Sequence, residues 1–219
     1  MTNDMQHSIK HHLTEDLLMA YATGALPEAF SLTIATHISL CDDCRAALMA
    51  YESVGGAVMD QGEAAELDAD CLSRTMALIA AGPKEPIART KRDSVFPVPL
   101  ADYIGGGPDK VKWRSAGGGV KQAILPTAKG AVARLLYIPA GSAVPDHGHR
   151  GVELTLVLQG AFKDEEGHFS RGDIEVATES DVHTPIADEG MPCICLAATD
   201  APLRFKGILP RIAQPFLRI

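Results

Sequence analysis

The sequence predicts a two-domain protein, with a bundle of about four helices first and an all-β barrel after it. Helical spacing of apolar residues, with capping residues, fills the first part of the 219-residue chain. Short alternating stretches separated by glycine and proline fill the second part. Between them, residues 82–97 are rich in proline and charge and lack periodicity, as a linker does. We therefore expect domains at residues 1–81 and 98–219.

The first two helices have recognisable ends. Thr14 can cap a helix that Gly24 stops. Pro27 suits the first turn of a second helix, which is expected to run to the region of His37.

Two more helices are predicted before the linker. One follows Cys44 and fades at Gly55–Gly56. Asp68 can cap the other, in which apolar residues recur at helical spacing. This apolar stripe includes Leu72, Met76 and Ile79. It is expected either to pack inside the domain or to dock another protein.

A His-x3-Cys-x2-Cys spacing ends the second predicted helix. On a helix, His37 and Cys41 lie one turn apart on one face and Cys44 follows one turn later, so the three side chains can converge on one ion. Zinc favours four N or S ligands in a tetrahedron, so a fourth ligand is required. The nearby candidates are His11 and His12, with His7 further away. We predict a closed structural zinc site in the N-terminal domain.

The net charge of −8 is unevenly distributed. Residues 1–80 contain three Lys/Arg and twelve Asp/Glu, a net charge of −9, whereas the remaining residues carry a net charge of +1. An acidic module repels phosphate, which argues against binding to nucleic acid. It attracts a basic protein surface instead, unless the acidity serves only solubility.

Cysteine usage and hydropathy favour a cytoplasmic protein. The chain has five cysteines, an odd number, and two of them belong to the zinc motif, so a disulfide framework is not expected. The N-terminus lacks a basic-then-apolar signal sequence, and no apolar run approaches the ~20 residues of a membrane span. No membrane partner is therefore expected.

The second part of the chain predicts many short strands, as in a sandwich or barrel. The expected strands are 111–114, 119–125, 131–138, 153–158, 161–163, 173–177 and 194–197.

A second metal-type cluster lies among these strands, with the spacing Gly141-x5-His147-x-His149-x3-Glu153-x6-Gly160. Residues two apart in a strand face the same way, so His147 and His149 project together. Glu153 can add a carboxylate oxygen to the two imidazoles.

His183, which ten residues separate from Gly172, is the natural fourth ligand. Three His and one Glu suit Zn, Mn, Fe(II) or Ni, so the donor set does not identify the metal. The Gly141–Gly160 box resembles the first motif of the cupin family in every spacing. The second motif matches in part, because Thr178, Ser180 and Ala187 stand where that family has proline, glycine and asparagine. The resemblance implies a double-stranded β-helix barrel with a metal in its mouth.

Cys193 and Cys195 alternate along a strand, so both thiols face one side. On the barrel interior they would lie beside the metal as candidate redox residues. The alternative is that they are small buried hydrophobic residues.

With both parts considered, nearly the whole chain resembles the ChrR-type cupin anti-sigma factors. The segments that carry the resemblance are H-H-L-T-E-D-L-L, H-I-S-L-C-D-D-C, P-D-H-G-H-R-G-V-E-L-T-L-V-L-Q-G-A-F and C-I-C-L-A-A-T-D-A-P-L-R-F. The resemblance implies one zinc ion in each domain. The implied N-terminal ligands are His12, His37, Cys41 and Cys44. The implied cupin ligands are His147, His149, Glu153 and His183.

The resemblance also implies a function in transcription regulation. The helical domain would bind an extracytoplasmic-function-type sigma factor, in a 1:1 complex, and cover its RNA polymerase-binding surface. The cupin domain would be the input module for release under singlet oxygen or organic hydroperoxide stress. The stripe of Leu72, Met76 and Ile79 then becomes a candidate contact with the sigma factor.

Two other classes of function compete with this one. A three-His, one-Glu site with an open coordination position can serve a metal-dependent dioxygenase or isomerase. The sequence lacks a clear substrate-orienting set for such an enzyme, which would also have no use for the acidic zinc module. A DNA-binding regulator is disfavoured by the N-terminal charge of −9.

Overall fold

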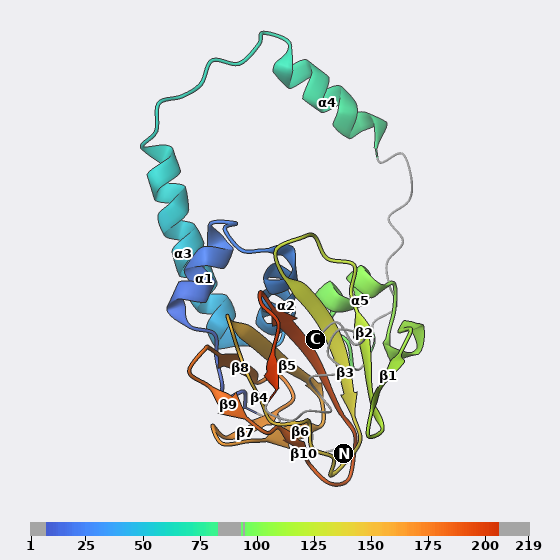
Figure 1. Cartoon of the computed structure of the whole chain (residues 1–219). Coiled ribbons are helices and arrows are strands. Elements are labelled where there is room, and N and C mark those ends of the chain that lie inside the picture. The colour runs from blue at the N-terminus through green and yellow to red at the C-terminus, as the bar shows by residue number, and fades with distance from the viewer. Residues whose placement is uncertain (1–7, 83–92, 94, 206–219) are drawn as a thin grey trace, which may run out of the picture.

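Five α-helices precede the strands of an antiparallel barrel in the part of the chain that the computed structural model describes, residues 8–82, 93 and 95–205 (Figure 1). The order expected from the sequence, helices and then a β-barrel, is confirmed. His7 and most of the predicted linker lie outside the described residues. The helices are α1 (Glu15–Ala22), α2 (Glu28–Ile38), α3 (Asp42–Asp60), α4 (Cys71–Ala81) and α5 (Val98–Ile104), with a 3-10 turn η1 (Pro108–Lys110).

The strands form one large and two small sheets. The six-stranded sheet has the order β1-β2-β3-β11-β5-β8, and the others have the orders β10-β6-β7 and β12-β4-β9. The strands are β1 (Arg114–Gly117), β2 (Val120–Ile124), β3 (Val132–Ile138), β4 (His147–Gly148), β5 (Glu153–Gln159), β6 (Ala161–Lys163), β7 (His168–Ser170), β8 (Ile174–Ala177), β9 (Val182–His183), β10 (Ile186–Ala187), β11 (Cys193–Thr199) and β12 (Arg204–Phe205).

Alternation along the central strands divides them between two environments. On β5, Leu154 and Leu156 belong to a core cluster that includes the helices, whereas Val157 belongs to a second cluster inside the barrel. On β11, Leu196 and Cys195 divide in the same way. Both faces of these strands are therefore buried, which explains why their sequences are almost continuously apolar.

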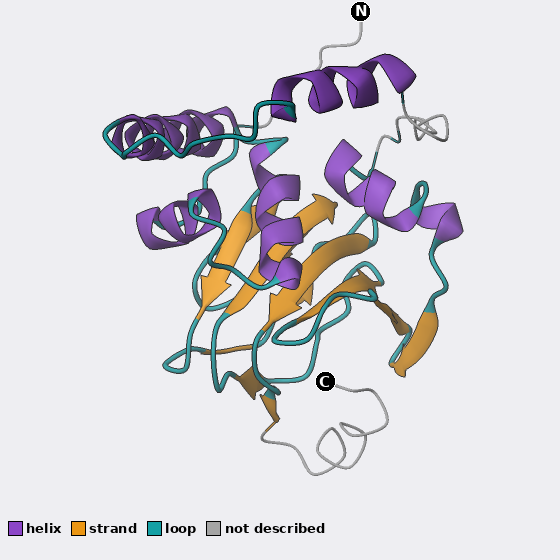
Figure 2. Ribbon diagram, turned by 90° about the horizontal axis from the view of Figure 1, so that it is seen from above, coloured by secondary structure: helices purple, strands orange, loops and turns teal. Residues whose placement is uncertain are grey.

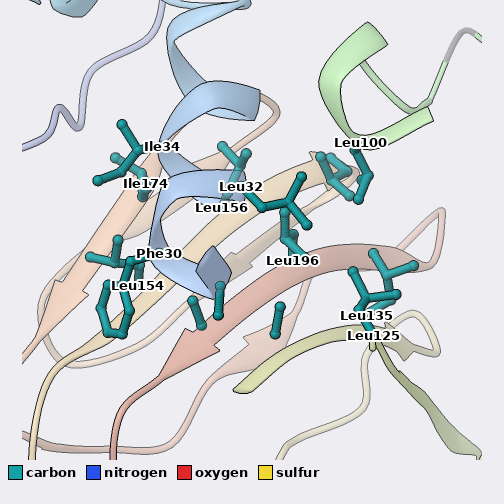
Figure 3. Packing of buried hydrophobic residues seen from close by; sticks show 14 of the residues in the cluster. Phe30, Leu32, Ile34, Leu100, Leu125, Leu135, Leu154, Leu156, Ile174 and Leu196 are labelled. Carbon is teal, nitrogen blue, oxygen red and sulfur yellow. The ribbon is translucent and has the colours of Figure 1, made fainter. Parts of the chain in front are cut away.

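Helix α2 covers the outer face of the large sheet (Figure 2). Its residues Phe30 and Ile34 lie against β5 and β8, as the side chains of Leu154 and Ile174 show in Figure 3. Phe30 is 3 % exposed and Ile34 is fully buried. The predicted helical part and the predicted barrel thus contribute to one continuous hydrophobic core.

Capping explains the start of α1. Thr14 is its N-cap, and the Thr14 side chain accepts a hydrogen bond from the Leu17 amide at 3.4 Å, as the sequence predicted. Gly24, with φ +68°, follows the C-cap of α1 in the left-handed conformation that glycine adopts readily.

The predicted limits of the third helix are wrong at both ends. Helix α3 begins at Asp42, because the Cys41 side chain accepts a hydrogen bond from the Cys44 amide and acts as the N-cap. It runs through Gly55–Gly56 to Asp60. Each glycine in a helix interior costs about 1 kcal/mol relative to alanine, which is not enough to end a helix of this length.

Two other local predictions fail. The segment 111–114 is mostly irregular, and the first strand instead spans Arg114–Gly117. Helix α5 was not predicted, because Pro97 and Pro99 conceal its short apolar pattern. Pro97 is its N-cap, and Leu100 is fully buried in the shared core.

The end of α3 and the whole of α4 project from the body of the molecule (Figure 1). Helix α4 contains no buried residue. None of the helices in the described ranges combines the length and apolar character needed to cross a bilayer.

Candidate metal centres

The four residues of the predicted N-terminal site converge. The ligand atoms of His12, His37, Cys41 and Cys44 all lie within 4.8 Å of one another. His12 Nδ1 is 3.2 Å from Cys41 Sγ and 3.7 Å from Cys44 Sγ, and His37 Nε2 is 3.3 Å from Cys44 Sγ. Zinc–ligand distances of about 2.3 Å for sulfur and 2.0 Å for nitrogen place tetrahedral ligands roughly 3.5 Å apart. The donor set and its spacing therefore fit a tetrahedral ion.

The turn between α2 and α3 brings these ligands together, whereas their spacing suggested a single helix. Helix α2 ends at Ile38, one residue after His37. The chain then turns, and Cys41 adopts an extended conformation as the N-cap of α3. A continuous helix would leave all ligands on one side of a cylinder, whereas this corner lets His37 and Cys44 approach from two helices.

His12, and not His11, lies beside the thiols. The His11 ring instead packs against Phe169, with ring centroids 4.2 Å apart. The His11 Nδ1 atom is 3.6 Å from an Asp173 carboxylate oxygen. The preference for His12 over His11 thus agrees with the geometry.

The ring of His37 is oriented from the barrel. Its Nδ1 atom lies 3.0 Å from the Gly172 carbonyl oxygen, which can only accept, so Nδ1 carries the proton and Nε2 presents its lone pair to the cluster. Burial lowers the pKa of His37 to about 4, which keeps the imidazole neutral and able to bind a cation. Burial also raises the pKa of Cys44 to about 11 without an ion. A bound cation would supply the charge that stabilises its thiolate.

Three imidazoles converge in the barrel. His149 Nε2 lies 3.3 Å from His183 Nε2, which lies 3.2 Å from His147 Nε2. The antiparallel pairing of β4 with β9 sets His147 directly opposite His183. All three side chains are buried.

Each Nδ1 atom of this cluster faces an acceptor. His147 Nδ1 is 2.9 Å from the Pro145 carbonyl oxygen. His149 Nδ1 is 3.3 Å from a Glu153 carboxylate oxygen. His183 Nδ1 lies 2.8 Å from Asp164 and 2.9 Å from Glu175. The three Nε2 atoms converge on one another, so one ion could bind all three, an arrangement typical of metal-binding histidines.

Glu153 lies beside the three imidazoles and not among them. Its Oε1 atom accepts a hydrogen bond from the Thr155 hydroxyl at 3.1 Å, and Oε2 faces His149 Nδ1. The group of ligand atoms within 4.8 Å of one another contains only His147, His149 and His183. The assignment of Glu153 as a direct ligand stays a prediction.

Asp164 and Glu175 are functional candidates that the sequence reasoning missed. Burial opposes the charged form of His183, but hydrogen bonds to these two carboxyl groups raise its pKa to about 9. Burial raises the pKa of Glu175 to about 7. The signal for Glu175 is its place in the otherwise apolar stretch Ile174–Ala177, where a buried carboxyl group requires a partner. Asp164 is in a polar turn, where no pattern distinguishes it.

A cavity of about 510 Å³ opens beside the barrel cluster. Its walls combine the site residues His147, Glu153 and His183 with apolar side chains. The apolar lining includes Leu136, Ile138, Val144, Phe162 and Leu203.

Cys193 and Cys195 face the same side, as the alternation predicted, and both are buried. Their Sγ atoms are 3.4 Å apart, and Cys195 lines the cavity. The hydrogen bond that the Cys195 thiol shares with Cys193, together with burial, holds the pKa of Cys195 well above its ordinary value. A protonated thiol is a poor nucleophile, so the redox role of this pair stays a prediction that its environment does not favour.

Comparison with known proteins agrees with this arrangement. Residues 104–201 match the family described as the ChrR Cupin-like domain. The chain is 55 % identical over 212 residues to the Anti-sigma-E factor ChrR of Cereibacter sphaeroides, covering 97 % of this chain and 100 % of that protein. A crystal structure of Rhodobacter sphaeroides SigE in complex with the anti-sigma ChrR contains a similar chain, with a TM-score of 0.79 and 53 % identity, covering 88 % of this chain and 100 % of that one. The chain therefore belongs to the ChrR family of anti-sigma factors.

Proposed function

We propose that this chain binds an extracytoplasmic-function-type sigma factor in a 1:1 complex and inhibits it by covering its RNA polymerase-binding surface. The observation that carries the proposal is the 55 % identity to an anti-sigma factor along almost the whole chain. The relative of known structure is in complex with SigE. The chain is a regulatory protein and not an enzyme, so the alternative of a cupin dioxygenase or isomerase is set aside.

The projecting helices offer the contact surface. On α4, Leu72 is 74 % exposed, Met76 is 56 % exposed and Ile79 is 67 % exposed, so this stripe does not pack within the described part of the chain. Val54 and Val58 of α3 are exposed as well. Exposed apolar side chains at helical spacing are typical of a helix that binds in an apolar groove of a partner protein. We assign Leu72, Met76 and Ile79 to the sigma-factor interface.

Charge supports the same kind of partner. The acidic residues at the start of α3, Asp42 and Asp43, lie next to the N-terminal metal cluster and are part of the −9 region. Sigma factors present basic surfaces to DNA and to polymerase, and opposite charge accelerates and orients such association.

We infer that both clusters hold zinc. His12, His37, Cys41 and Cys44 would hold one ion and fix the corner between α2 and α3, which makes metal binding part of folding there. His147, His149 and His183, with Glu153, would hold the other. Neither ion has a catalytic task in this proposal.

The barrel would serve as the input module. Its cavity beside the three imidazoles gives small molecules access to the cluster. We propose that residues 98–219 respond to singlet oxygen or organic hydroperoxide and that residues 1–81 then release the sigma factor. RNA polymerase is in the cytoplasm, which is the compartment we assign to this chain.

Binding of the sigma factor by a triple variant tests the interface. Leu72→Ser, Met76→Ser and Ile79→Ser together are expected to weaken binding to the co-expressed sigma factor about 100-fold, because buried apolar contacts at interface centres dominate affinity. The matched control is Leu78→Ser, on another face of α4 and 74 % exposed. Isothermal titration calorimetry measures both. Unchanged affinity in the triple variant contradicts the assignment.

A further inference from the structure

Four consecutive residues, Gly172 to Glu175, contact both metal clusters. They comprise the end of the turn after β7 and the first two residues of β8, and they pass between the N-terminal segment and the interior of the barrel. Gly172 and Asp173 bond to the N-terminal side, and Glu175 bonds to the barrel cluster. We name Gly172–Glu175 the bridging segment.

The carboxylate of Asp173 fixes the chain just before His12. Its Oδ1 atom accepts hydrogen bonds from the Lys10 amide at 2.6 Å and the His11 amide at 3.0 Å. Its Oδ2 atom accepts from the Ser170 amide at 2.8 Å and the Ser170 hydroxyl at 2.9 Å. Asp173 is fully buried, so these four donors replace all of its hydration. The position of the His12 ring therefore depends on a carboxylate of the barrel.

Gly172 orients the second imidazole ligand through its carbonyl oxygen, which accepts from His37 Nδ1 at 3.0 Å. Close approach of the N-terminal segment requires glycine here. Gly172 has φ +93°, and a Cβ atom would lie 2.7 Å from Ile9 Cδ1. Both histidines of the N-terminal cluster are thus positioned from the bridging segment.

The other end of the bridging segment reaches the barrel cluster. Glu175 Oε1 lies 2.9 Å from His183 Nδ1. Ile174, between the two ends, donates its amide to the His11 carbonyl oxygen at 3.3 Å. A shift of His183 that moves Glu175 therefore moves strand β8, and the two residues just before this strand, Gly172 and Asp173, position His37 and the chain before His12.

We propose that the bridging segment couples the two clusters, with Asp173 and Gly172 as positioning residues of the N-terminal metal site. Disturbance at His183 then loosens metal retention at Cys41 and Cys44, because one continuous segment, Gly172–Glu175, carries both sets of bonds. This inference rests on the metal sites of the proposed function. It adds the path by which the barrel acts on the sigma-binding part.

Transfer of Co²⁺ from the full-length chain to excess EDTA tests the proposal. Thiolate-to-Co²⁺ charge transfer in the near ultraviolet reports the N-terminal cluster alone, because the barrel cluster contains imidazoles and a carboxylate. Asp173→Asn replaces one accepting carboxylate oxygen by an amide NH₂ group. This group would face the N–H or O–H donors that bond to Asp173. It is expected to accelerate loss of this band about tenfold, a typical effect of an outer-shell partner.

Two further variants distinguish a positioning role of Asp173 from misfolding of the Asp173→Asn protein and from a general effect of substitution in the barrel. Ser170→Ala removes one of the bonds to Asp173 and is expected to accelerate loss about threefold. It keeps the test decisive if Asp173→Asn does not fold. Asp188→Asn, on the same barrel, removes the exposed pair with His168 and is expected to leave the rate unchanged.

A double-mutant cycle tests the coupling itself. His183→Ala is expected to accelerate loss of the thiolate band about threefold when Asp173 is intact and to add almost nothing in the Asp173→Asn protein. Additive effects of the two substitutions overturn the coupling.

The remaining outcomes are also decisive. Equal rates in the unmodified chain, Asp173→Asn and Ser170→Ala overturn the positioning role, as does an effect of Asp188→Asn as large as that of Asp173→Asn. If the unmodified chain shows no thiolate band with Co²⁺, the N-terminal metal site of the proposed function is wrong and the coupling falls with it. If the unmodified chain shows the thiolate band but the substitutions leave the rate of Co²⁺ loss unchanged, the coupling is rejected and the N-terminal metal site is not.

Discussion

His37 illustrates how one side chain can belong to two parts of the molecule. Its Nε2 atom faces Cys44 within the N-terminal cluster, and its Nδ1 atom donates to the Gly172 carbonyl oxygen of the barrel. It is fully buried, so both ring nitrogens need protein partners or an ion. The His-x3-Cys-x2-Cys spacing identified it as a ligand candidate, but the spacing says nothing about Gly172.

Loss of one thiol at the N-terminal cluster is expected to unfold this part of the chain. Cys44→Ser should lower the zinc content from two ions to one per chain and abolish sigma-factor binding, because the proposed ion would supply folding free energy there. Atomic emission of the purified protein and a pull-down measure both. Cys71→Ser, on α4, is the matched control and should retain both ions. A Cys44→Ser protein that still binds its partner tightly would contradict the structural role.

A substitution at the barrel cluster is expected to preserve sigma-factor binding, in contrast to Cys44→Ser. His147→Ala should leave inhibition of the sigma factor intact and blunt the response to singlet oxygen, because we propose the barrel as the input module and the projecting helices as the contact surface. A reporter gene under a sigma-dependent promoter measures both states. Exposed His168, on β7 outside the cluster, gives the control substitution His168→Ala. Normal induction in the His147→Ala strain would remove the cluster from the signalling path.

Helix α2 links the two parts at the scale of the element. Its C-terminal end carries His37, and its apolar face, including Phe30, Leu32 and Ile34, covers the large sheet (Figure 3). A helix that is apolar on most sides is expected in a core and not on a surface. A change in the packing of the sheet therefore acts directly on α2, the helix that carries the candidate ligand His37.

The Phe30→Ala substitution tests this link. Removal of the ring leaves a cavity between α2 and the sheet, so the free energy of unfolding should fall by about 3–4 kcal/mol. Met19→Ala on α1, which is 49 % exposed, should change it by less than about 0.5 kcal/mol. Urea denaturation followed by circular dichroism measures both, with the strand signal showing whether the barrel unfolds in the same transition. A barrel signal unaffected by Phe30→Ala would mean that the two parts unfold independently.

Local chemistry explains which elements were predictable. The start of α1 follows from Thr14 alone, and the strands β3, β5 and β11 follow from short stretches rich in apolar residues that glycine and proline separate. The two-residue strands β4 and β9 are too short for any periodicity, and they exist because the ladder of the small sheet holds them. The corner at Cys41 was missed because ligand spacing on a helix and across a turn can be the same.

At the scale of the whole molecule, α2 covers the outer face of the large sheet, whereas α4 projects away from it. Without residues 1–81, the sheet would expose Leu154, Leu156, Ile174 and Leu196, all of which are at most 2 % exposed in the intact chain. An apolar patch of this kind promotes association.

Expression of residues 98–219 alone tests this consequence. The isolated barrel is expected to bind a hydrophobic dye and to elute as oligomers in size-exclusion chromatography, whereas the full chain elutes at the size of a monomer. A matched fragment with Leu154→Lys should recover the monomer. A monomeric unmodified fragment that does not bind the dye would show that the sheet closes over its own outer face.

The sequence by itself determined the order of the two parts, most of the two sets of metal-type ligands and the apolar stripe on α4. The spacings that carry these predictions, such as His37 to Cys44, His147 to Glu153 and Leu72 to Ile79, are local, so periodicity and propensity act on them directly. Only the tertiary structure decided that Glu175 and Asp164 hold His183 and that Gly172 faces His37. These partners are brought together by the fold, His37 and Gly172 from positions 135 residues apart, and no local rule connects them.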